Sequence, residues 1–199
     1  MPSFNERLEL LDNDLVVTPV RISTYHDLPF AIFNYDPKDE YRVRKEIDRL
    51  STRLRNLGKN VVQISLAEIF WESIEMNDEI NNIVNDEKKQ GFLKVQDLLY
   101  TYLTDVDFTP LPDLLAEKLS SLNPQKDIAF IVRAACLAPS IYPISQLMSH
   151  MQGITEVPTV LFYPGCREGI TNLRYMCMEN RAPIGSYRAP IGSYRVKIY

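Results

Sequence analysis

One stretch of the chain decides its fold: Leu28-Pro29-Phe30-Ala31-Ile32-Phe33-Asn34-Tyr35-Asp36-Pro37-Lys38-Asp39-Glu40. Its apolar part, residues 30–33, does not alternate with polar residues, which is typical of a strand covered on both faces. Asp36 offers a carboxylate to the free N–H groups of a first helical turn, and Pro37 suits the first helical position. The stretch therefore predicts a buried strand that runs directly into a helix.

The segments that follow predict a repeated strand–helix order. Apolar residues recur at four- and three-residue steps along one helical face: Val43, Ile47, Leu50, Leu54 and Leu57. Gly58 is suited to end this helix. Residues 60–64 predict a second strand, and Ser65-Leu66-Ala67-Glu68 matches the capping box that begins a helix. This order implies parallel strands joined by right-handed crossovers.

The rest of the chain predicts a helical insertion and two further buried strands. Residues 77–122 contain helical patterns and no convincing strand, whereas residues 127–132 and 158–163 are strand-like. We expect Pro164-Gly165 to stop the fourth strand in a turn. The last alternating segments, residues 173–178 and 194–199, are expected to form an antiparallel pair at one edge.

Together these elements predict one α/β domain over residues 1–199. We expect a mostly parallel sheet flanked by helices, with a short first helix over residues 5–17. The topology is P-loop-like but lacks a phosphate loop. The helical insertion spans about residues 77–122, and the C-terminal edge hairpin about residues 172–199.

Composition limits the possible partners. The 22 basic and 26 acidic residues give a net charge of −4, so no whole-protein attraction to nucleic acid or anionic membrane is expected. No apolar run approaches the ~20 residues needed to span a bilayer, and no signal peptide is evident. The three cysteines, Cys136, Cys166 and Cys177, have no metal-like spacing. We expect a cytoplasmic protein with reduced thiols.

The positions where a P-loop enzyme holds nucleotide carry other residues here. Residues 34–40 lack the glycines of a phosphate cradle, and the third strand ends in Arg133 instead of an acidic Mg²⁺ ligand. Asp36, Asp39 and Glu40 offer carboxylates for a nuclease-like metal site, but Ser65, at the end of a neighbouring strand, is not acidic. A capped helix with a charged first turn is therefore favoured over a metal site.

Other reactive side chains lack partners at useful spacing. His26 and His150 have no evident nucleophile or carboxylate nearby in sequence. Arg167 follows Cys166, but the arginine of a Cys-based phosphatase loop is missing. We therefore predict no catalytic, metal-binding or cofactor-binding residue, and expect that the protein is not an enzyme.

Two motifs resemble a known family. Residues 29–37 (Pro-Phe-Ala-Ile-Phe-Asn-Tyr-Asp-Pro) and 157–165 (Val-Pro-Thr-Val-Leu-Phe-Tyr-Pro-Gly) are similar to BrxB, a component of the bacteriophage exclusion (BREX) defence systems of bacteria and archaea. The resemblance covers nearly the whole chain in segment order, and residues 194–199 fit the family's final strand. It implies an intracellular protein acting with the ATPase BrxC, the phosphatase-superfamily protein PglZ and the methyltransferase PglX. It implies no catalytic residues.

Three functions of different kinds remain open. The first is a scaffold or adaptor in which aromatic side chains contact a partner: Phe70, Trp71, Tyr163 and Tyr175. The second is a phosphoryl-transfer or nuclease-like enzyme using the acidic turn at residues 36–40. The third is DNA binding through the arginines of the first long helix: Arg42, Arg44, Arg49, Arg53 and Arg55. Those arginines alternate with acids, which favours a solvated face. The adaptor is the preferred hypothesis, with DNA contacted only indirectly.

The tail carries an unusual repeat. Residues 181–187 (Arg-Ala-Pro-Ile-Gly-Ser-Tyr) recur identically as residues 188–194. Two copies of seven residues are too few and too short for a solenoid. We expect the first copy to form a surface loop, because the closure entropy of a loop grows only slowly with its length.

Overall fold

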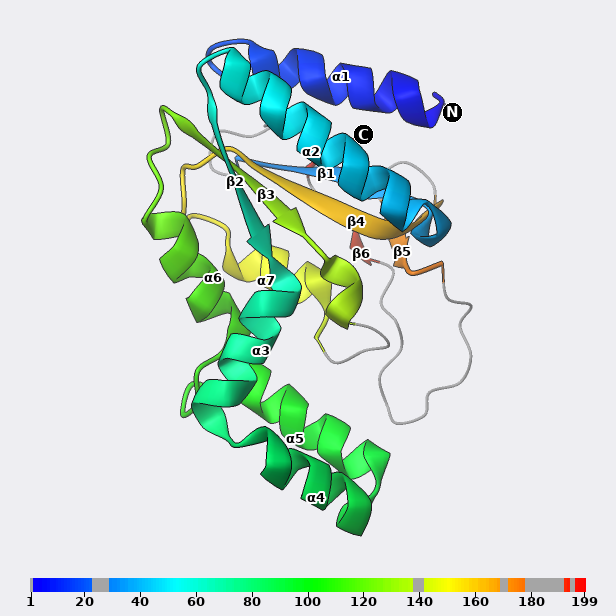
Figure 1. Cartoon of the computed structure of the whole chain (residues 1–199), viewed down its shortest axis with the longest axis vertical. Coiled ribbons are helices and arrows are strands. Elements are labelled where there is room, and N and C mark those ends of the chain that lie inside the picture. The colour runs from blue at the N-terminus through cyan, green and yellow to red at the C-terminus, as the bar shows by residue number, and fades with distance from the viewer. Residues whose placement is uncertain (1, 23–28, 138–141, 169–171, 178–191, 194–195) are drawn as a thin grey trace.

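The structure is a computed structural model that describes residues 2–22, 29–137, 142–168, 172–177, 192–193 and 196–199. These residues form a seven-stranded sheet whose main path has the order β2-β3-β4-β1-β7 (Figure 1). The strands of this path are β2 (Asn60–Ser65), β3 (Asp127–Val132), β4 (Thr159–Glu168), β1 (Phe30–Tyr35) and β7 (Lys197–Ile198). Neighbours along it pair in parallel. The predicted α/β class with a mostly parallel sheet is confirmed.

Strand β1 lies inside the sheet, between β4 and β7. All six of its side chains are buried, as its unbroken apolar pattern predicts. Because successive side chains of a strand point to opposite faces, β1 contributes to two cores. Phe30 and Ile32 belong to one apolar cluster, and Ala31, Phe33 and Tyr35 belong to the other.

Helices cover both faces of the sheet. On one face, α1 (Phe4–Val16) and α2 (Glu40–Asn56) pack their apolar stripes against β1, β3 and β4. On the other face lie α3 (Leu66–Asn77), α6 (Leu111–Ser120) and α7 (Ile144–His150) (Figure 1). The predicted first helix is present. The predicted stripe of α2 is buried at Val43, Ile47, Leu50 and Leu54, but Leu57 lies just after the helix and is exposed.

The helix starts follow the predicted capping chemistry. The carboxylate of Asp36 accepts a hydrogen bond of 3.0 Å from the Lys38 N–H, at the start of the short 3-10 helix Pro37–Asp39 that leads into α2. The hydroxyl of Ser65 accepts a hydrogen bond of 3.3 Å from the Glu68 N–H and caps α3. Both side chains satisfy donors that have no partner inside the helix.

Every regular element between β2 and β3 is a helix. The segment contains α3, α4 (Ile80–Gln90), α5 (Phe92–Thr104) and α6. Figure 1 shows that α4 and α5 form a hairpin at the end of the molecule farthest from α1 and α2. No residue of α4 is buried, so this hairpin projects from the body of the protein. We call residues 66–108 the helical projection.

The predicted end of β4 is wrong. The strand does not stop at Pro164-Gly165 but continues to Glu168. Pro164 is the last residue in register with β1, and from Gly165 onward β4 pairs antiparallel with β5 (Asn172–Tyr175). The Pro164 carbonyl accepts a hydrogen bond of 2.9 Å from the Met176 N–H. The Pro-Gly pair thus marks a change of strand partner, because β5 supplies new pairing where β1 ends.

The predicted pairing of the last two segments also needs correction. Strand β5 is antiparallel, but its partners are β4 and the short β6 (Gly192–Ser193). Strand β7 instead pairs in parallel with β1. The free edge of β1 offers backbone groups to this segment: the Tyr199 N–H donates to the Ile32 carbonyl at 2.9 Å. Apart from Gly192 and Ser193, the duplicated residues 181–194 lie outside the described residues.

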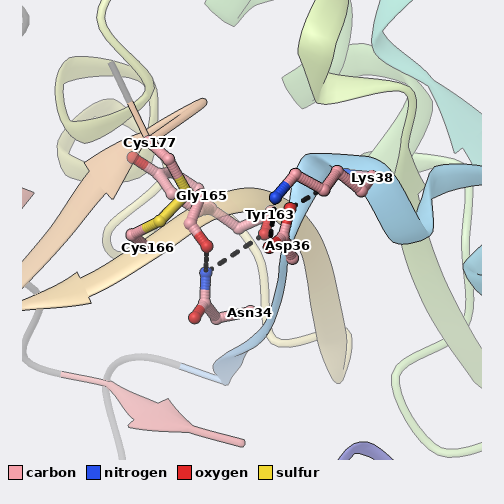
Figure 2. The surroundings of a disulfide bond; sticks show 7 residues. All are labelled: Asn34, Asp36, Lys38, Tyr163, Gly165, Cys166 and Cys177. Carbon is pink, nitrogen blue, oxygen red and sulfur yellow. Dashed lines mark hydrogen bonds and ion pairs between the residues drawn. A yellow bond between two sulfur atoms is a disulfide. The ribbon is translucent and has the colours of Figure 1, made fainter. Parts of the chain in front are cut away.

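The expectation of three reduced thiols is wrong for two of them. Cys166 and Cys177 form a disulfide, with their Cα atoms 4.9 Å apart (Figure 2). They are 11 residues apart in the chain, and the antiparallel pairing of β4 with β5 brings them together. Cys136 is free, and burial raises the pKa of its thiol to about 12.

Candidate functional site

The carboxyl edge of the parallel strands is the usual ligand site of an α/β sheet. Here it contains a hollow of about 150 Å³, bordered by α2 and strand residues. Its charged lining includes Glu40, Arg44, Asp48 and Arg133. Small-molecule pockets typically measure about 300–1,000 Å³, so this hollow is smaller than a typical ligand site.

Of the three acidic candidates at this edge, Asp36 and Glu40 have structural contacts, whereas the Asp39 side chain does not cap its helix. Glu40 accepts a hydrogen bond from the Tyr35 hydroxyl and another of 2.8 Å from Arg44 Nε. Burial, together with the bond to Glu40, raises the pKa of Tyr35 well above its usual range. Asp36 caps the following turn. Within the described ranges, no three His, Cys, Asp or Glu side chains are grouped as a metal site requires.

We predict that Asp36→Ala lowers the free energy of unfolding by about 1 kcal/mol, because it removes the cap of the turn that starts at Pro37. Chemical denaturation measures this loss. An unchanged free energy of unfolding would show that Asp36 does not stabilise this turn.

The end of β1 is tied to β4 and not left open. Asn34 is 6 % exposed, and its amide Nδ2 donates to the Gly165 carbonyl at 2.8 Å and to the Tyr163 carbonyl at 3.4 Å. Figure 2 shows this amide pointing toward the start of the disulfide-linked hairpin of β4 and β5. Where a P-loop protein presents backbone N–H groups to phosphate, this chain presents a side-chain amide to its own backbone.

The arginines of α2 are engaged within the chain. Their contacts are Arg42 to the Asn5 side chain, Arg44 to Glu40, Arg49 to Glu46, Arg53 to Asp12, and Arg55 to the Val61 carbonyl. The Arg53 contact involves a largely buried carboxylate, and burial raises the pKa of Asp12. The contacts of Arg42 and Arg53 join α2 to α1, and all five contacts leave less of the cationic surface that DNA phosphates require.

The four aromatic candidates separate into two groups. Phe70, Tyr163 and Tyr175 are 7 %, 1 % and 9 % exposed, so their rings belong to the core and cannot meet a partner directly. The rings of Tyr163 and Tyr175 meet edge to face, and the Tyr175 hydroxyl donates to the Ala134 carbonyl at 2.8 Å. Trp71 is 51 % exposed. The prediction of a partner contact therefore rests on Trp71.

Other exposed apolar side chains lie on the same part of the chain as Trp71. The large exposed apolar residues of the helical projection are Trp71, Met76, Ile80, Val84, Phe92, Leu93, Val106 and Phe108. In the remaining described ranges they are Leu10, Tyr41, Leu57 and Ile154. Sequence reasoning missed this concentration, because a helical pattern shows which apolar residues share a face but not whether another element covers that face.

Comparison with known proteins identifies relatives. The family model described as "BREX protein BrxB" matches residues 62–189. A curated "BREX protein BrxB" of Bacillus cereus (strain H3081.97) is 26% identical over 146 residues, which cover 73% of this chain and 74% of that protein. No solved structure gives a significant match. None of the helices in the described part is both long and apolar enough to cross a membrane.

The family match includes β3, most of β2 and the whole helical projection, and it reaches past the disulfide-linked hairpin. It covers more than half of the chain. This agrees with the resemblance carried by residues 157–165. The chain belongs to the BrxB family of BREX proteins.

Proposed function

We propose that this chain is a non-catalytic adaptor of a BREX anti-phage assembly and that it docks onto partner proteins through the helical projection. Family membership supports the assignment to BREX. The observation that carries the adaptor role is the concentration of large exposed apolar side chains between Trp71 and Phe108. The partners that the family resemblance implies are BrxC, PglZ and PglX, acting in the cytoplasm.

The hairpin of α4 and α5 is the clearest part of this surface. A helix on a globular protein normally buries an apolar stripe, yet Ile80 and Val84 of α4 stay 43 % and 41 % exposed. At the start of α5, Phe92 and Leu93 are 56 % and 48 % exposed. Burying a fully exposed side chain of this kind contributes about 1.5–3 kcal/mol, so each of these half-exposed side chains contributes about half of that when a partner covers it. A partner that covers the hairpin therefore gains substantial binding energy.

The contacts at the sheet edge favour the adaptor over the alternative functions. An enzyme acting through residues 36–40 needs free carboxylates, but Asp36 caps a turn and Glu40 accepts from Tyr35 and Arg44. A DNA-binding subunit acting through α2 needs free arginines, and those of α2 have intramolecular contacts.

We predict that the double variant Phe92→Ser/Leu93→Ser loses at least tenfold in recovery of BREX proteins during affinity purification from the native host. Both side chains are about half exposed, so the variant should stay folded. Quantitative mass spectrometry of the bound fraction measures the recovery, and circular dichroism checks the fold.

The matched control is Leu10→Ser/Ile154→Ser. Leu10 and Ile154 are 52 % and 53 % exposed but lie outside the helical projection. The control should bind like the wild type. Equal recovery of BREX proteins by both double variants would contradict docking through the hairpin.

A further inference from the structure

The outer face of α3 combines tryptophan with carboxylates. Glu68 and Glu75 lie three residues before and four residues after Trp71, so all three side chains share one helical face. All three are exposed. The buried Phe70 ring packs edge to face against the Trp71 indole, and the two ring centroids are 5.2 Å apart. We call Glu68, Trp71 and Glu75 the acidic tryptophan face.

The charge of the helical projection differs from that of the rest of the chain. Residues 66–108 hold ten Asp and Glu residues against three Lys residues, a net charge of −7. The whole chain carries −4, so the residues outside the projection are net positive. The apolar surface proposed for docking is therefore also the acidic part of the protein.

The carboxylates of the acidic tryptophan face have room for a cation. Glu72, one residue beyond Trp71, forms a salt bridge of 2.8 Å with Lys118 of α6. By contrast, neither Glu68 nor Glu75 forms a salt bridge with any residue that the structure describes. Each of these carboxylates lies about one turn from the exposed indole, one before it and one after it, so both can attract a cation that approaches the ring.

We propose that the acidic tryptophan face binds a basic amphipathic helix of a partner protein, with an Arg or Lys side chain over the Trp71 indole. Tryptophan is the ring that attracts a cation most strongly. Glu68 and Glu75 then pair with basic side chains one turn away on the partner helix. This proposal rests on the adaptor function and specifies its partner chemistry.

Charge decides between this occupant and two others. A nucleic acid brings phosphates toward a surface of net charge −7, which repels them. A second copy of this chain brings its own net charge of −4, and the arginines of its α2 already have intramolecular contacts, so it matches the acidic face less well than a basic segment does. A helix rich in Lys and Arg can pair with the carboxylates, and its apolar residues can cover the exposed indole.

The test is the double charge reversal Glu68→Lys/Glu75→Lys in the full chain. We expect at least a tenfold loss of BREX proteins recovered from the native host at low salt. The isosteric variant Glu68→Gln/Glu75→Gln adds no positive charge, so it cannot weaken binding through new repulsion. We expect it to lower the recovery of BREX proteins about threefold or more. The control, Glu117→Lys/Glu156→Lys, makes the same charge change at two exposed sites outside the projection and should bind like the wild type.

A carbodiimide cross-linker identifies the partner chemistry directly, because it joins carboxylates only to amines in contact. On the assembled complex we expect links from Glu68 or Glu75 to Lys residues of a basic partner helix. Wild-type recovery by both double variants, or links from these residues to a segment without basic neighbours, would overturn the proposal. If Phe92→Ser/Leu93→Ser still abolishes recovery in that case, the adaptor function stands and only its partner chemistry fails.

Discussion

Replacing Gly165 by alanine should lower the free energy of unfolding by about 3 kcal/mol. A Cβ at this position would lie 2.4 Å from the Arg174 carbonyl oxygen and 2.6 Å from Cε1 of Tyr163. The first contact is with backbone of the paired strand β5, and the second is with a buried ring, so neither can move cheaply. For a chain of this size the melting temperature should fall by roughly 6–12 °C.

The control for this prediction is Gly58→Ala. Gly58 has a φ of +81°, but no heavy atom lies within 4 Å of the place that a Cβ would occupy, so alanine there meets only the backbone cost of about 1–2 kcal/mol. Thermal melts of both variants make the comparison. If Gly165→Ala is no more destabilising than Gly58→Ala, β4 and β5 do not approach each other closely at Gly165.

The second large effect is expected at Asn34. Asn34→Leu keeps the branched shape and the number of heavy side-chain atoms but removes both N–H donors, which leaves the Gly165 carbonyl without its 2.8 Å partner in a buried place. An unpaired buried polar group costs about 1–3 kcal/mol, and the longer contact to the Tyr163 carbonyl is lost as well. We therefore expect the free energy of unfolding, measured by denaturant titration, to fall by about 3 kcal/mol. The slope of that free energy against denaturant concentration should not change.

Asn60→Leu provides the comparison for Asn34→Leu. The Asn60 amide donates to Asp127 Oδ1 at 2.9 Å at an exposed position, where water replaces the lost bond. Asn60→Leu should lower the free energy of unfolding by less than about 1 kcal/mol. Similar losses for the two variants would mean that the buried amide does not hold β1 to β4.

Local sequence signals were sufficient for the elements that depend on local chemistry. The apolar run of β1 and the caps Asp36 and Ser65 are present as predicted, because capping and burial patterns are read from adjacent residues. The continuation of β4 past Pro164-Gly165 was not predictable in this way. It depends on pairing with β5, and that pairing is a tertiary contact.

The same limit explains the errors at the cysteines and the last strand. Cys166 and Cys177 meet only because of the register between β4 and β5, which the spacing of cysteines does not reveal. Strand β7 joins β1 because the order of the sheet leaves that edge of β1 free. Strand order is a property of the whole fold.

The two adjacent aromatic residues of α3 show a signal that the sequence did contain. Phe70 has apolar residues four positions away on both sides, Leu66 and Ile74, and all three are buried. Trp71 has Glu68 three positions before it and Glu75 four positions after it, and its ring is half exposed. Helical spacing alone therefore separates the core ring from the surface ring.

The most direct test of the proposed adaptor is hydrogen–deuterium exchange of the chain, free and within the BREX assembly purified from its host. Docking through the helical projection predicts slower exchange across residues 66–108, with little change in α1 and α2. Protection confined to residues 35–44 at the carboxyl edge of the sheet, with the projection unchanged, would contradict docking through the projection.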